Sequence, residues 1–235
     1  MKIIVLFLSP LWIFASVHYA KVEPYDSVIL RSAVSALVMD VDVDAEGSVV
    51  HQKRVILLDD RLDKMNLKIS KAKLETLSET LQRQESSFKR MNKLKTASVS
   101  QKDTAYYSFA STKTQYLDMQ YRIAQLEDSI QKKSLVLNDK YLYKLMVRKG
   151  DFVAPGSALA QVMQTNRAKL VLFLEPEELK NLESKHVYID GKETSYRVNK
   201  VWKVADEKFI SSYRVEIYID APKESFSTLL KVEIK

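Results

Sequence analysis

The chain has 235 residues, of which 46% are hydrophobic and 29% are charged, a composition typical of globular domains and not of disordered segments. It contains no cysteine and only three histidines, which excludes disulfides and nearly excludes cysteine–histidine zinc sites and cysteine nucleophiles. The net charge of +7 favours an anionic membrane surface, but the lysines are interleaved with acids and no nucleic-acid-binding platform is present.

Residues 1–20 are predicted to form a secretory signal peptide. Lys2 precedes an apolar run from Ile3 to Val17, and the small residue Ala20 closes the segment. The run is short for a membrane span and contains Pro10, so we expect cleavage, with an uncleaved anchor as the alternative. The mature chain is therefore expected to be soluble outside the cytoplasm.

Residues 21–60 are predicted to contain strands, because apolar and acidic residues alternate with a period of two. This pattern places Leu37, Met39, Val41 and Val43 on one face and Val38, Asp40, Asp42 and Asp44 on the other. The acids up to Glu46 resemble a calcium loop, but Ala45 and His51 stand where such a loop needs glycine and glutamate. We therefore interpret them as the solvated face of a strand and expect no metal site.

Residues 61–139 change to a period of seven, which predicts two helices of a coiled coil. The first helix has its core positions at Leu67, Ser70, Leu74, Leu77, Leu81, Gln84, Phe88 and Met91. The second has them at Phe109, Thr112, Tyr116, Met119, Ile123, Leu126, Ile130, Lys133 and Leu137. The polar link at about 93–104 is so short that the helices must run antiparallel, and Ser100 followed by Asp103 predicts the start of the second helix.

A short β-strand sequence pattern occurs twice, once before and once after the predicted helices. "KGDFVAPGSALAQV" begins at Lys149, and a looser version, "AEGSVVHQKRVILL", begins at Ala45. At one offset Gly47 matches Gly150, Val50 matches Val153 and Ile56 matches Leu159. We interpret residues 21–60 and 140–167 as two halves of one β domain, with the hairpin inserted at a turn because its two ends lie close together.

Residues 168–235 are predicted to be mostly strand. "KLVLFLEPEELKNLE" predicts a strand followed by a short helix that is entered through Pro176. Asp190-Gly191 marks a turn, and "SSYRVEIYID" and "LLKVEIK" alternate as strands do.

The order of these segments resembles the periplasmic adaptor subunits, or membrane fusion proteins (HlyD-like), of tripartite efflux pumps and type I secretion, over residues 22–235. The first half-motif matches from Ile29 to Val38 and continues to Gly47 and Val50. The second half matches at four positions, Gly150, Val153, Gly156 and Leu159. Ala36 and Lys53 replace expected glycines, and the membrane-proximal domain of full-length adaptors is expected to be absent or vestigial.

The resemblance implies a mixed α and β fold. It consists of a lipoyl-like (biotinyl/lipoyl) β domain split by an antiparallel α-helical coiled-coil hairpin and followed by a small β-barrel at 168–235. It also implies a periplasmic location, associated with the inner membrane through a transporter, and it allows a peripheral contact with the inner membrane itself. The chain would form a homo-oligomeric ring, by resemblance a hexamer. It would bridge an inner-membrane transporter (of the RND type, or alternatively an ABC transporter) and a TolC-like outer-membrane channel, for export of drugs or other small molecules.

Many adaptors of this family carry an Arg-Leu-Ser pattern around the hairpin tip that docks on the channel. The matching positions are Arg90, Leu94 and Ser100, with the Leu-to-Ser spacing one residue shorter than expected. These residues would supply a cation for channel carboxylates, an apolar knob and a hydroxyl. The alternative interpretation is that Arg90 is a solvated flank, Leu94 closes the hairpin core and Ser100 only caps a helix.

Other functions remain as alternatives: an adaptor for type I secretion or an ABC transporter, a biotin- or lipoyl-type carrier, or a stand-alone coiled-coil protein. A carrier needs its modified lysine at a tight turn between the half-motifs, and here the hairpin replaces that turn. No spacing singles out a nucleophile and its base, so we expect neither catalytic residues nor a cofactor.

Overall fold

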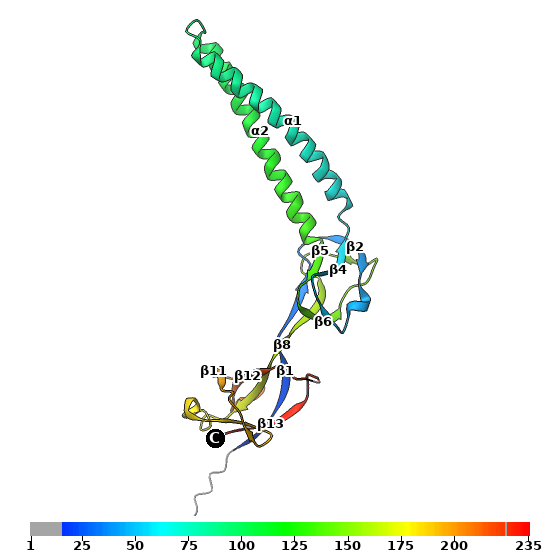
Figure 1. Ribbon diagram of the computed structural model, residues 1–235, viewed down its shortest axis with the longest axis vertical. Helices are drawn as coiled ribbons and strands as arrows, with labels where there is room; N and C mark the ends of the chain where they lie inside the picture. The colour runs from blue at the N-terminus through cyan, green and yellow to red at the C-terminus, as the bar shows by residue number, and fades with distance from the viewer. Residues whose placement is uncertain (1–15, 224) are drawn as a thin grey trace, which may run out of the picture. The chain divides into compact units, whose positions relative to one another are not determined.

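The computed structural model describes residues 16–223 and 225–235 and divides into two compact units (Figure 1). The central unit comprises residues 29–162, and the terminal unit comprises residues 16–28 and 163–235. Two long strands, β1 (Val17–Arg31) and β8 (Ala158–Leu174), run from one unit into the other. Most of the predicted signal peptide, residues 1–15, lies outside the described residues, but Val17–Ala20 already belong to β1 and Ala20 is buried.

The central unit contains two long helices between short strands. Its first part consists of β2 (Ala36–Val41), η1 (Val43–Ala45), β3 (Val49–Val50) and β4 (Lys53–Leu58). The helices α1 (Arg61–Lys93) and α2 (Val99–Lys132) follow, and then β5 (Ser134–Leu137), β6 (Lys140–Leu145) and β7 (Phe152–Val153). The prediction of a mixed α and β fold with two long helices is confirmed.

The helices pack antiparallel along the face that the period of seven predicts. Every predicted core position from Leu67 to Met91 and from Phe109 to Ile130 is buried or half-buried, with Ser70 and Ile123 the most enclosed. The predicted second helix was too long at its end, because α2 stops at Lys132 and Leu137 lies in β5 and packs in the β core. Near the tip the ring of Phe88 stacks on Phe109 with 5.9 Å between centroids. Figure 1 shows the two helices side by side over their whole length.

The base of the hairpin is held by a polar contact between the first turn of α1 and the end of α2. Asp63 Oδ2 accepts a hydrogen bond from the Ser129 hydroxyl at 2.7 Å and lies 2.9 Å from Lys133 Nζ. The Lys133 ammonium lowers the pKa of the Asp63 carboxyl below its ordinary value of 3.8, and the Ser129 hydroxyl lowers it further.

This contact predicts a loss of stability in acid. A carboxyl whose pKa is lower in the folded chain than in the unfolded chain contributes stability that is present above pH 3.8 and is lost as the pH falls through the folded pKa. We expect Asp63→Asn to cost about 1 kcal/mol at pH 7 and to flatten the decline of the thermal midpoint below pH 4. Circular dichroism melts between pH 7 and pH 2 test this, with Asp103→Asn, an exposed site on α2, as the matched control. A decline below pH 4 that is equally steep in Asp63→Asn would contradict the assignment.

The two half-motifs form the same hydrogen-bonded clamp. The N–H of Gly47 donates to the carbonyl of Leu142, and the N–H of Leu142 donates to Ser48. In the second copy the N–H of Gly150 donates to the carbonyl of Val38, and the N–H of Val38 donates to Asp151. Both glycines have positive φ, 82° and 95°, a conformation that other residues adopt only with strain. The sequence repeat therefore corresponds to a structural repeat within one core.

In each clamp the glycine bonds the backbone of a residue from the opposite half-motif. These residues, Leu142 and Val38, are both buried in the core of the central unit. The clamps also lead into matching two-residue strands: β3 pairs with β6, and β7 pairs with β2. The aligned residues Val50 and Val153 are buried in the same core. The prediction that the two copies complement each other agrees with this arrangement.

The hairpin enters and leaves the β core through neighbouring strands. β4 and β5 pair antiparallel, with Leu57 opposite Ser134, and the N–H of Leu58 donates to the carbonyl of Lys133 at 2.8 Å. The ends of the inserted helices are thus adjacent in the ladder, which is why a long insertion is compatible with a small β core.

The alternation predicted around Leu37 is out of phase with the structure. Val38, not Leu37, lies in the core, and Leu37 is exposed beside Phe152 of β7. The pairing of β2 with β4 is irregular between Val38 and Asp40, and a bulge of this kind shifts which side chains face inward. Asp42, which follows β2, pairs with Lys53 of β4 at 2.5 Å.

The terminal unit is built on a sheet with the strand order β10-β9-β13-β1-β8-β12-β11. It adds η2 (Leu182–Ser184), β9 (Val187–Ile189), β10 (Lys192–Glu193), β11 (Val198–Ala205), β12 (Tyr213–Asp220) and β13 (Leu229–Ile234). Its core consists of alternate residues of these strands: Ala20, Val22, Ala168, Leu170, Leu172, Leu174, Val187, Val215, Ile217, Ile219 and Val232. The predicted short helix after Pro176 is wrong, because residues 176–181 form turns and only the single 3-10 turn η2 follows.

Candidate docking site at the hairpin tip

The last turn of α1 places a cation and an apolar side chain together. Arg90 is exposed on this turn, and Leu94, which ends the helix, leaves it with an extended backbone. The N–H of Leu94 still donates to the carbonyl of Met91 at 3.2 Å, which fixes where the chain turns away. The Leu94 side chain is 51% exposed, so it does not close the hairpin core.

The second helix begins two residues earlier than predicted. Ser98 is the N-cap: its hydroxyl accepts from the N–H of Gln101 at 3.2 Å, and the Gln101 side-chain oxygen accepts from the N–H of Ser98 at 2.9 Å. This reciprocal pair is a capping box. Ser100 lies inside the first turn, where its carbonyl accepts from the Thr104 hydroxyl. The predicted capping role of Ser100 is therefore wrong.

The capping box makes the two serines distinguishable by experiment. Ser98→Ala removes an acceptor for an otherwise unpaired helix N–H and should cost about 1 kcal/mol of stability. Ser100→Ala should change the stability by less than about 0.5 kcal/mol, since alanine is a good helix former at an exposed position. Urea unfolding of the full chain, followed at 222 nm, measures both. Equal effects of the two substitutions would contradict the N-cap assignment.

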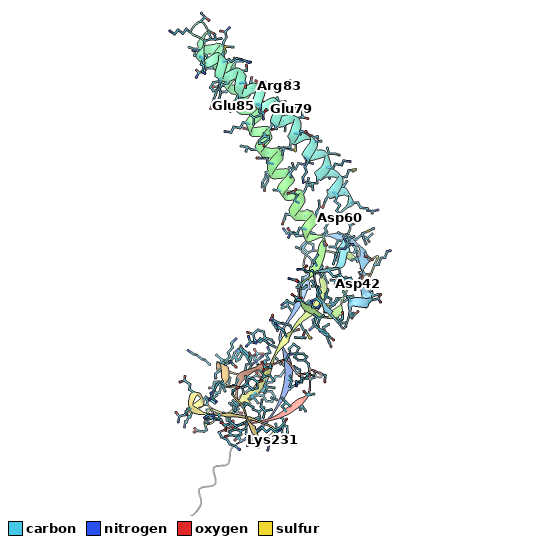
Figure 2. All side chains as sticks on the ribbon, viewed as in Figure 1. Asp42, Asp60, Glu79, Arg83, Glu85 and Lys231 are labelled. Carbon is cyan, nitrogen blue, oxygen red and sulfur yellow. The ribbon has the colours of Figure 1, made fainter. Side chains whose placement is uncertain are left out.

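Two shallow, open grooves on the surface of α1 meet at Arg90. One, of about 460 Å³, is lined by Ser87, Met91, Lys93 and Leu94 together with Arg90. The other, of about 570 Å³, continues toward the middle of the helix between Glu79, Gln82, Arg83 and Ser86. Figure 2 labels Glu79 and Arg83 on this stretch of α1. Arg90 and Leu94, predicted as a pair, thus share one groove, whereas Ser100 lies on the other helix.

Basic residues dominate the tip. Arg90, Lys93 and Lys95 are exposed within a few residues of each other. The nearest acid of α1, Glu85, is already paired with Lys89 at 2.6 Å, and this ammonium lowers the pKa of the Glu85 carboxyl. The site can therefore attract carboxylates and receive an apolar side chain beside them.

Sequence reasoning missed Val99, which is an exposed apolar residue in the first turn of α2. The available signal was an aliphatic residue between two serines in an otherwise polar link. It extends the apolar part of the tip beyond Leu94.

Within residues 16–235, apart from 224, no group of three or more histidine, aspartate or glutamate side chains is arranged to hold a metal ion. Neither α1 nor α2, nor any other helix in the part of the chain that the structure describes, is long and apolar enough to cross a bilayer.

Comparisons with known proteins agree on one fold. No protein-family model and no curated protein sequence matches the chain. Among solved structures, the membrane fusion protein Spr0693 from Streptococcus pneumoniae superposes with a TM-score of 0.71 at 8% identity, over 94% of this chain and 98% of that one. A MacA–MexA chimera that carries the α-hairpin domain of Pseudomonas aeruginosa MexA superposes with a TM-score of 0.67 at 15% identity. This match covers 94% of this chain and 81% of the chimera. MacA from Actinobacillus actinomycetemcomitans superposes with a TM-score of 0.61 at 15% identity, over 94% of this chain and 78% of that one.

The chain has the fold of the membrane fusion proteins, also called periplasmic adaptors. The predicted resemblance to this family is confirmed for the fold, and the superposition includes the inserted helices as well as both β parts, because it covers 94% of the chain.

Proposed function

We propose that this protein is a periplasmic adaptor subunit of an export pump, with a structural and not a catalytic role. Its central unit is a lipoyl-like domain split by a coiled-coil hairpin, and its terminal unit is the β-barrel of such adaptors. The two equivalent clamps and the fold shared with membrane fusion proteins support this assignment.

The observation that carries the proposal is the groove at the hairpin tip. An exposed arginine and an exposed leucine share it, and neither serves the hairpin core. In this function Arg90 bonds a carboxylate and Leu94 enters an apolar groove of a TolC-like outer-membrane channel. Ser100 contributes a hydroxyl on the neighbouring helix.

The other partners belong to the same proposal. Several copies pack side by side into a ring, by analogy a hexamer, and the terminal unit contacts an inner-membrane transporter of the RND type. An ABC transporter or a type I secretion system is the alternative partner. The transported molecule is a drug or another small molecule that the transporter, not the adaptor, selects.

Photo-crosslinking in cells tests the docking directly. The photoreactive residue is placed at Val99, which is exposed and leaves the capping box of Ser98 intact. We expect it to trap an outer-membrane channel. The same residue at Tyr121, exposed on the shaft of α2, is the matched control and should not trap the channel. Trapping of this chain alone from Val99, or of nothing in cells where the protein is abundant, would overturn the docking proposal.

A further inference from the structure

The end of β11 and the turn that follows it expose apolar side chains in the terminal unit. We name residues 204–210, with Val204, Phe209 and Ile210 as their apolar members, the apolar loop. Val204 is 77% exposed, Phe209 50% and Ile210 83%. Exposed aliphatic and aromatic side chains gathered on one short turn need a physical explanation, whereas isolated ones do not.

The loop is an ordered structure. The Asp206 carboxylate accepts from the N–H groups of Lys208 and Phe209 at 2.9 and 3.2 Å. The N–H of Asp206 donates to Ser212, and the N–H of Ser212 donates to Phe209. The Phe209 ring packs on Phe173 of β8 with 4.4 Å between centroids. Because these bonds fix the backbone of the turn, ordering the loop on binding costs less conformational entropy than ordering a flexible loop would.

Lysines flank the apolar side chains. Lys203 is exposed just before the apolar loop and Lys208 is exposed within it, next to Phe209; Lys200 lies earlier in β11 with its ammonium 4.3 Å above the Trp202 ring. Of the acids in the turn, Asp206 is engaged by its own backbone, which leaves Glu207 as the exposed carboxylate. Over residues 200–210 the three lysines, against Asp206 and Glu207, leave a net charge of +1, and a positive excess beside apolar side chains favours an anionic surface.

The loop lies at the end of the terminal unit where β1 begins. Tyr213, at the start of β12, is opposite Leu174, the last residue of β8. His18, at the start of β1, contacts Glu178 just after β8 at 2.8 Å. The apolar loop therefore lies at the end of the terminal unit where β1 begins and β8 ends.

We propose that the apolar loop inserts into the surface of a lipid bilayer that contains anionic lipid. A stable protein–protein interface needs about 800 Å² from each partner and some 20 residues a side, far more than this turn presents. A bilayer interface requires only a few apolar side chains with flanking cations. This inference rests on residues of the terminal unit and is independent of docking at the hairpin tip.

The absence of cysteine allows a site-specific test in the full chain. Ile210→Cys carries an environment-sensitive fluorophore, and Leu62→Cys, an exposed leucine at the start of α1, carries the same dye as the matched control. Vesicles of phosphatidylcholine with 30% phosphatidylglycerol are compared with pure phosphatidylcholine. We expect a blue shift and a several-fold increase in emission at position 210 with anionic vesicles, weakened by salt, and no change at position 62.

Vesicle sedimentation of unlabelled variants provides the second measurement. Ile210→Asp should weaken binding to anionic vesicles roughly tenfold relative to Leu62→Asp, because an ionised side chain replaces the inserted one. Equal binding of the two variants would show that another segment, such as residues 1–15, holds the membrane, and would overturn the proposal. So would a dye at position 210 that responds to an added membrane protein in detergent but to neither kind of vesicle.

Discussion

Export is expected to be lost when Arg90 is replaced by glutamate and Leu94 by aspartate in the same chain. In the proposed docking, the first substitution reverses the charge that would meet a carboxylate of the channel, and the second places an ionised group where an apolar side chain would be buried. A hydrogen bond to a charged group contributes about 1.5–3 kcal/mol, and a buried leucine about 2 kcal/mol. Their combined loss would weaken docking by at least a hundredfold.

The double variant should still fold, because both side chains are exposed and neither packs in the hairpin core. The measurements are dye accumulation in cells and the crosslinking yield from Val99. Leu62→Asp combined with Lys68→Glu makes the same chemical changes on an exposed face of α1 away from the tip and serves as the control. Normal export by the tip variant, at a normal protein level, would show that these two residues do not dock the channel.

Replacing Leu142 with alanine is expected to have the largest effect on stability. Its side chain is 0% exposed and lies in the core of the central unit, and its backbone is held by Gly47 and Ser48. Truncation of a buried leucine leaves a cavity and costs about 2–5 kcal/mol. The clamp prevents the backbone from moving inward to fill that cavity, so we expect the upper half of this range.

Urea unfolding of the full chain measures this loss. Tyr143→Ala, the exposed neighbour on the same strand, is the matched control and should cost less than about 1 kcal/mol. Val38→Ala probes the equivalent clamp. It should also lower the stability of the chain, but by less than Leu142→Ala, because fewer atoms are removed. Similar unfolding midpoints for Leu142→Ala and Tyr143→Ala would mean that the clamped half-motifs do not form the structural centre of the unit.

The hairpin is the part of the structure that could be predicted best. A residue on a helix meets its partners at spacings of three and four, so a period of seven names the packed face without knowledge of the rest of the fold. The positions from Leu67 to Met91 are accordingly half-buried or better. The repeated glycines were equally informative, because a positive φ is a local demand that glycine meets at low cost.

Predictions that depended on distant pairing were less successful. The phase of β2 was wrong at Leu37 and Val38, since the irregular pairing with β4 places Val38 inside and Leu37 beside Phe152, whereas Met39–Val41 follow the predicted alternation. At the tip, Ser98 and Ser100 both precede plausible partners three residues later, Gln101 and Asp103. In the structure the capping box forms between Ser98 and Gln101, so α2 begins after Ser98.

The sequence by itself determined the order of the modules, the two long helices with their packed faces, and the internal repeat, because each of these depends on residues close together in the chain. The tertiary structure alone decided which halves clamp each other, which tip residues share a groove, and that Val204, Phe209 and Ile210 stay outside the terminal core. The physical reason is that strand register and side-chain exposure result from pairing between segments that are far apart in the chain, such as Ala36 and Val153, which are more than a hundred residues apart. Residue patterns along a single strand do not encode such pairing.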